Sequence, residues 1–229
     1  MGATNGSRPE NRPQMRINIR PLGNPLPLGL FSFGIGMLLL AGESCRWIPV
    51  GEAPQLGIVL AAFVFPLEGL ATIMAYLARD TLASTVLGLF ATSWLALGLV
   101  LITGTPGAIS ITEGIYLLGF AGAIASLALI ASTGKPLIAF ILALSATRAI
   151  LYGLFEVTST RGLETAAGIV AAVIAGVAWY AGTAFAFEDL RQRPLLPVLR
   201  RGAGSSAMED ELAAQLARAR HEAGVRQQL

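Results

Sequence analysis

The sequence is short of the residues that carry most catalytic and metal chemistry. It has 229 residues, with one cysteine, Cys45, and one histidine, His221. A single cysteine allows neither an internal disulfide nor a cysteine metal cluster. No serine or threonine in the apolar part of the chain has a histidine base, because His221 lies in the polar C-terminal region. We therefore expect no enzyme, no metal site and no cofactor.

Charged residues are also scarce. They make up only 13% of the chain, about half of the roughly 25% found in an average soluble domain. Hydrophobic residues make up 54%, and the mean hydropathy is +0.66. No Walker-type glycine loop with lysine is present, which argues against ATP-driven pumping by this chain alone. The composition indicates a membrane protein whose surroundings are the lipid bilayer, and we expect no nucleic-acid partner.

Six apolar segments are candidates for membrane-spanning helices, which need roughly 20 residues. The segments are residues 28–42, 55–78, 81–103, 114–133, 136–157 and 165–187. The first is short, and it spans only if it begins nearer Asn24 or continues past Gly42. Four arginines precede it, as in a signal peptide, but no clear small-residue cleavage site follows. The sequence thus predicts an all-α membrane protein with six transmembrane helices within residues 23–187.

The basic residues predict the orientation of these helices, because cytoplasmic loops carry an excess of Lys and Arg. With the N-terminus inside, thirteen of the sixteen Lys and Arg fall on the cytoplasmic side. Only Arg46 and Arg161 fall outside, and Arg148 lies within a helix. We therefore expect both termini in the cytoplasm of a multi-pass protein of the inner or plasma membrane.

The two ends of the chain differ from the apolar middle. Residues 1–22 are polar and basic and are predicted to be disordered. Residues 188–204 read as a linker, and residues 205–229 as a cytoplasmic amphipathic helix. Ser206 and Glu209 have the spacing of a capping box at the start of that helix.

Charged residues within the predicted spans are few, and such residues commonly have functional roles. Glu68 lies near the middle of the second span and Arg148 near the middle of the fifth. With a rise of about 1.5 Å per residue, each lies about 2 Å from the centre of its span. The two side chains could form a structural ion pair facing the bundle interior, or they could line a substrate path.

The stretch NPLPLGL at residues 24–30 resembles the NPAPLGL motif of the acetate uptake transporter family, the bacterial succinate–acetate permeases and their relatives. Further matches are RPLLP at 193–197, WYA at 179–181 and FATSW at 90–94, so that the resemblance covers about residues 22–200. The motif residues that would shape the cytoplasmic mouth are Asn24, Pro25, Pro27 and Gly29.

This resemblance implies six helices around a central path for acetate and similar small monocarboxylates, assembled as a homo-hexamer. It also implies an apolar constriction, whose positions here are Phe33, Phe90 and Leu144, with Ser145 as the alternative to Leu144 in register. The sequence departs from the family at Glu68, where a glycine is usual, and at Arg148, where an apolar residue is usual. Small residues in the fourth and sixth segments could pack helices within one protomer or between protomers.

The leading functional hypothesis is therefore a transporter or channel for small carboxylates, with proton-linked passage. One alternative is a passive pore for another small solute. A third reading is a non-transporting membrane sensor or scaffold that acts through the C-terminal helix.

Overall fold

The computed structural model describes residues 23–191 and 196–199. All regular structure in these residues is helical, and six spans are long and apolar enough to cross a membrane, as predicted. The helices are α1 (Leu26–Ser44), α2 (Ala53–Val59), α3 (Phe65–Leu77), α4 (Thr81–Thr103), α5 (Ile111–Ser132), α6 (Pro136–Thr158) and α7 (Arg161–Arg191). The predicted disordered tail at 1–22 and the predicted helix at 205–229 lie outside the described residues, as does part of the predicted linker at 188–204.

The first span is longer than the sequence segment at both ends. α1 has 19 residues, because it begins at Leu26 and continues to Ser44. Its start is held by the side chain of Asn24, whose Oδ1 accepts a hydrogen bond from the Leu26 amide at 3.0 Å. Pro25 and Pro27 are tolerated here because the first amides of a helix have no partner within the helix. The proline-rich motif therefore starts the helix.

The second span is interrupted by a wider turn that the sequence analysis did not predict. A single-turn 3₁₀ segment (Val50–Glu52) and α2 lead into a π-helical stretch at Leu60–Val64, and α3 follows. Pro66 explains the interruption, since it has no amide to donate and its ring would clash with the carbonyl four residues earlier. Glu68 lies in the first turn of α3, directly after this irregularity.

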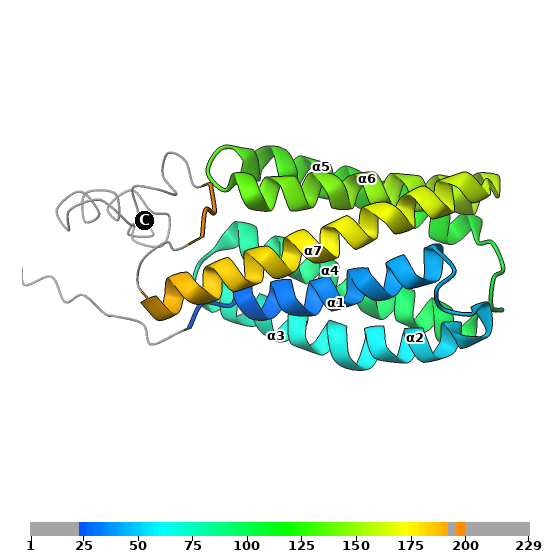
Figure 1. The fold of residues 1–229 in the computed structure, drawn as a ribbon, viewed down its shortest axis with the longest axis horizontal. Coiled ribbons are helices and arrows are strands. Elements are labelled where there is room, and N and C mark those ends of the chain that lie inside the picture. The colour runs from blue at the N-terminus through cyan, green and yellow to red at the C-terminus, as the bar shows by residue number, and fades with distance from the viewer. Residues whose placement is uncertain (1–22, 192–195, 200–229) are drawn as a thin grey trace, which may run out of the picture.

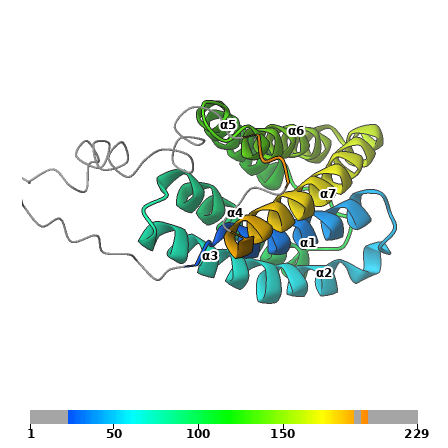
Figure 2. The ribbon, with the colours of Figure 1, turned by 60° about the vertical axis from the view of Figure 1, so that its left-hand side comes forward.

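The helices lie side by side along the long axis of the molecule (Figure 1). α1 packs along α7, α5 along α6, α6 against α7, and α4 against α2 and α3. Figure 2 shows the same bundle after a rotation of 60°. We call the end where α1 begins and α7 finishes the terminal end, and the opposite end, where α1 finishes and α7 begins, the far end. α7 continues to Arg191, beyond the boundary predicted at residue 187.

Polar contacts close both ends of the bundle. At the terminal end Lys135 Nζ lies 2.5 Å from Asp80 Oδ2, which joins the loops before α4 and α6. At the far end Arg46 pairs with Glu164 at 2.6 Å and so joins the end of α1 to the start of α7. The segment 196–199 returns to α7, where the Tyr180 hydroxyl donates to the Pro197 carbonyl at 3.0 Å.

Candidate functional site

Five cavities follow one another through the bundle between α1, α4, α5 and α6, and each shares lining residues with the next. The far-end cavity, of about 210 Å³, shares Glu43, Glu113 and Tyr152 with a small cavity of about 10 Å³. That cavity shares Arg148 with a third, also of about 10 Å³. The last two lie toward the terminal end and have volumes of about 40 and 580 Å³. The series of cavities, which we call the path, is therefore wide at both ends and narrow in the middle.

The narrow middle is closed by aromatic rings. Phe33 of α1 and Phe90 of α4 are in edge contact, with ring centroids 4.7 Å apart. Phe33 also contacts Trp94 at 5.9 Å, and Phe90 contacts Phe120 of α5 at 5.2 Å. Phe90 lines the cavities on both sides of this cluster. We call these four residues the aromatic cluster. An apolar constriction of this kind excludes hydrated ions by dewetting.

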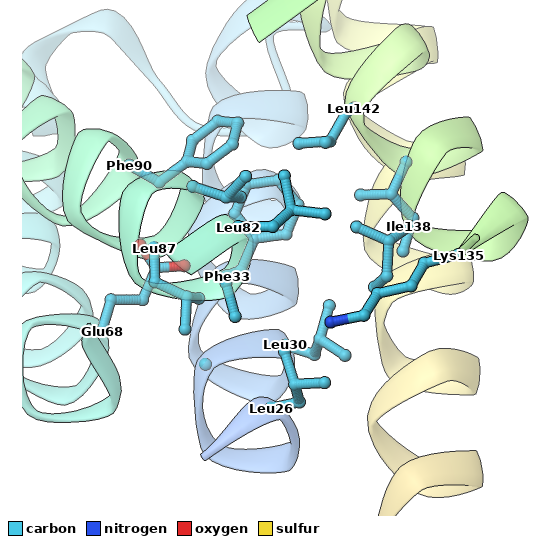
Figure 3. Close-up of a pocket in the computed structure, with 14 residues that line it drawn as sticks. Leu26, Leu30, Phe33, Glu68, Leu82, Leu87, Phe90, Lys135, Ile138 and Leu142 are labelled. Atoms are coloured by element: carbon cyan, nitrogen blue, oxygen red, sulfur yellow. The ribbon is translucent and has the colours of Figure 1, made fainter. Parts of the chain in front are cut away.

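The pocket on the terminal side of the aromatic cluster has a volume of about 40 Å³ and lies between α1, α4 and α6 (Figure 3). Phe33 and Phe90 lie across it from Ile138 and Leu142 of α6. At its mouth the Lys135 side chain reaches toward Leu30. The Lys135–Asp80 ion pair thus lies at the terminal entrance to a pocket whose walls are almost entirely apolar.

The third expected constriction residue, Leu144, lines none of these five cavities. It is half-buried and packs against the hydrophobic core. The α6 residues that line the three middle cavities are Ile138, Ile141, Leu142, Ser145, Arg148, Ala149 and Tyr152. They recur at intervals of three and four residues, which places them on one helical face. Of the two alternatives, Ser145 lies on this face, and it is 2% exposed.

Glu68 and Arg148 do not form the ion pair that their similar depth suggested. Among the described residues, Glu68 is fully buried and its Oε2 accepts a hydrogen bond from Trp94 Nε1 at 2.7 Å. Arg148 instead lies with its guanidinium carbon 4.9 Å from the ring centre of Tyr152. The pair prediction is wrong because depth along a span does not fix the direction of a side chain around its helix. Glu68 lines the pocket on one side of the aromatic cluster, and Arg148 lines the cavities on the other.

The hydrogen bond between Glu68 and Trp94 is expected to hold the aromatic cluster in place. Glu68→Leu leaves the buried indole N–H without an acceptor, a loss of about 1–3 kcal/mol in the free energy of unfolding. Adding Trp94→Phe removes that unpaired donor, so the double variant should lose less than the sum of the single variants. Unfolding in detergent measures the loss of stability in each variant. Trp47→Phe is the control, because the Trp47 side chain is 64% exposed. Strictly additive losses would contradict the bond.

The sequence analysis missed two acidic residues of the path, Glu43 and Glu113. It placed Glu43 just beyond the first segment and Glu113 just before the fourth. Both lie within helices, and both line the small cavity that Arg148 also lines. The signal was present for Glu43, because Phe33, Leu40 and Glu43 share a face at helical spacing.

Other polar residues of the path's ends have structural partners. Glu156 Oε2 accepts a hydrogen bond from the Ser110 amide at 2.6 Å, next to the start of α5.

Gly29 of the proline-rich motif lies against Leu87, whose Cδ2 would be 2.6 Å from a Cβ at this position. The motif thus forms the wall of the terminal-end cavities. The described residues contain no group of three or more His, Cys, Asp or Glu placed to hold a metal ion.

Comparisons with known proteins agree with this architecture. A sequence model of the GPR1/FUN34/yaaH family matches residues 8–192. A search of curated proteins gave no significant match. Among solved structures, the bacterial acetate channel SatP has a similar fold, with a TM-score of 0.69 and 21% sequence identity. The similarity covers 77% of this chain and 99% of the SatP chain.

Proposed function

The chain belongs to the GPR1/FUN34/yaaH family, and from that membership we propose that it is a multi-pass plasma-membrane transporter or channel for acetate and similar small monocarboxylates. The observation that carries the proposal is the series of cavities that meets at the aromatic cluster. The structural neighbour with the same fold is an acetate channel.

The geometry suits a small amphiphilic anion. The aromatic cluster offers an apolar surface to a short hydrocarbon tail and none of the ligands that would replace the water around a bare ion. A cationic side chain lies on each side of it, Lys135 toward the terminal end and Arg148 toward the far end. Because Lys135 is paired with Asp80, the stronger attraction for a carboxylate lies at Arg148, on the far side of the constriction.

Uptake of labelled acetate into liposomes that contain the purified full-length chain tests this proposal. Acetic acid crosses lipid unaided, so uptake is measured at about pH 8, where nearly all of a simple carboxylic acid is ionised. We expect uptake above that of protein-free liposomes, and acceleration by an inward proton gradient if passage is proton-linked. Equal rates with and without the gradient would identify a passive channel. No protein-dependent uptake of any short monocarboxylate would refute the function.

The terminal end is proposed to face the cytoplasm, because Arg79 and Lys135 lie at that end and both tails carry an excess of basic residues. In a Cys45→Ala background, Thr105→Cys at the exposed far-end loop should react with a membrane-impermeant thiol reagent in intact cells. Arg79→Cys should react only after the cells are opened. The reverse pattern would contradict the orientation.

Assembly into a homo-hexameric ring is proposed from the family resemblance, and outward-facing small residues support close contacts between protomers. A Cβ added at Gly119, Gly122 or Gly176 would meet no atom of the same chain within 4 Å. Gly168 differs, because its Cβ would lie 2.6 Å from Cys45 Sγ, so this glycine packs within the protomer. Exposed small residues permit close helix contacts in membranes.

Gly122→Leu is therefore expected to disrupt the ring without disturbing the protomer. Light scattering in mild detergent should show a species smaller than the wild-type assembly, while helical content stays unchanged. An assembly of unchanged mass would show that this face of α5 lies outside the interface.

A further inference from the structure

Arg148 is a buried cation that forms no ion pair within 4 Å among the described residues. Its side chain is 4% exposed, and its Nε has no hydrogen-bond partner within the described part of the chain. Its nearest aromatic neighbour is Tyr152, one turn further along α6. Buried charges in proteins are normally paired, because an uncompensated charge in an apolar medium is costly. The guanidinium also lines two cavities of the path, immediately beside the aromatic cluster.

We propose that Arg148 anchors the carboxylate group of the substrate at a binding site between the aromatic cluster and the far-end cavity. This inference rests on the function proposed above. A guanidinium presents a planar fork of N–H donors that matches both oxygens of a carboxylate. Ser93 of α4 lines the same cavity and is 5% exposed. Within the described residues its hydroxyl makes no hydrogen bond and so can add one donor.

The remaining walls of this site select the rest of the ligand. Phe90, Leu97, Leu117 and Phe120 also line this cavity, so they give the hydrocarbon tail of a bound acid an apolar surface. Ser145 contributes no donor, because its hydroxyl already donates to the Ile141 carbonyl at 2.8 Å. The cavity has a volume of about 10 Å³, about the space that a single water molecule needs, so the side chains around it must move apart before even acetate can bind.

Glu43 and Glu113 make this site a weak one. Both line the small cavity that Arg148 and Tyr152 line from α6. Neither lies within 4 Å of the guanidinium among the described ion pairs, yet both are close enough to oppose an incoming anion. The other charged groups at the far-end cavity have partners of their own. Glu164 is paired with Arg46, and Glu156 accepts a hydrogen bond from the Ser110 amide. A site that binds an anion weakly lets it leave, as conduction requires.

Equilibrium binding to the full-length chain in lipid nanodiscs tests this site. The probes are acetate and its neutral isostere acetamide, and calorimetry gives the affinities. Arg148→Gln should weaken acetate binding by about ten- to a hundredfold, the value of hydrogen bonds to a charged group. Acetamide binding should change little. Arg148→Lys should recover part of the affinity. Arg161→Gln, which removes an arginine whose side chain is 74% exposed at the far end, is the matched control and should bind acetate like the wild type.

Glu43→Gln gives an independent test, because removing the competing carboxylate should tighten acetate binding several-fold. If Arg148→Gln does not fold, Glu43→Gln alone tests the proposed site. Tighter acetate binding by Glu43→Gln supports the site, and unchanged or weaker binding overturns it. A folded Arg148→Gln variant with wild-type affinity overturns the site and leaves the proposed function standing if the wild type transports acetate. A wild type that neither binds nor transports carboxylates refutes the function itself.

Discussion

Replacing Phe90 with alanine is expected to admit larger carboxylates than the wild type transports. Phe90 contacts both Phe33 and Phe120 and lines the cavities on either side of the constriction, so loss of its ring joins these cavities. Pockets discriminate a single methylene by roughly 10–200-fold. We therefore expect the ratio of butyrate to acetate uptake in liposomes to rise by about tenfold or more, and Phe33→Ala to act in the same direction.

Phe140→Ala is the control for this experiment, because Phe140 lies on the same helix as Leu142 but is 51% exposed on the outer face. It should leave the ratio unchanged. The substitution at Phe90 also costs stability, about 3–5 kcal/mol for a buried phenylalanine, so folded protein must be quantified before rates are compared. Unchanged ratios in both Phe33→Ala and Phe90→Ala would remove these residues from the path.

Gly98→Ala is expected to destabilise the bundle, although alanine favours a helix by about 1 kcal/mol over glycine. A Cβ at Gly98 would lie 2.7 Å from the backbone carbonyl oxygen of Gly57, and one at Gly57 would lie 2.6 Å from that of Gly98. Backbone cannot move aside as a flexible side chain can, so α2 and α4 must separate. Overpacking of this kind costs about 1–3 kcal/mol, which exceeds the gain in helix propensity.

The matched control is Gly69→Ala, a helical glycine whose added Cβ would meet only Phe65 Cε2, at 4.0 Å. It should be neutral or slightly stabilising. Thermal unfolding of both variants in the same detergent gives the comparison. A Gly98→Ala variant as stable as Gly69→Ala would mean that α2 and α4 do not approach this closely.

The six spans could be predicted from the sequence because a helix in a bilayer needs a long apolar run, and such runs are visible without knowing the packing. The π-helical interruption at Leu60–Val64 could not be predicted, because the presence of Pro66 does not determine whether a helix kinks, widens or ends. Phe33 and Phe90 were placed by resemblance to a motif, and the structure brings their rings into contact.

The direction in which side chains point explains why some site residues could not be predicted from the sequence. Leu144 and Ser145 differ by one residue, which is about 100° around a helix, and only the packed bundle shows which of them faces the path. Glu68 and Arg148 lie at similar depths in their spans, but the Glu68 carboxylate accepts a hydrogen bond from Trp94 and does not pair with Arg148. Glu43 and Glu113 fall outside the apolar segments of the sequence, because the helices extend a few residues beyond the apolar runs.

Chemical block of the proposed path tests whether acetate passes through the bundle along it. In a Cys45→Ala background, Leu82→Cys places a thiol in the wall shared by the two terminal-side cavities. Tyr76→Cys, at a position 76% exposed on the outside of α3, is the control. Acetate flux through liposomes is measured before and after a methanethiosulfonate reagent is added on both sides. If acetate passes along this path, modification of Leu82→Cys should stop the flux and a reductant should restore it. The Tyr76→Cys control should be unaffected. Undiminished flux through fully modified Leu82→Cys protein would contradict passage along this path.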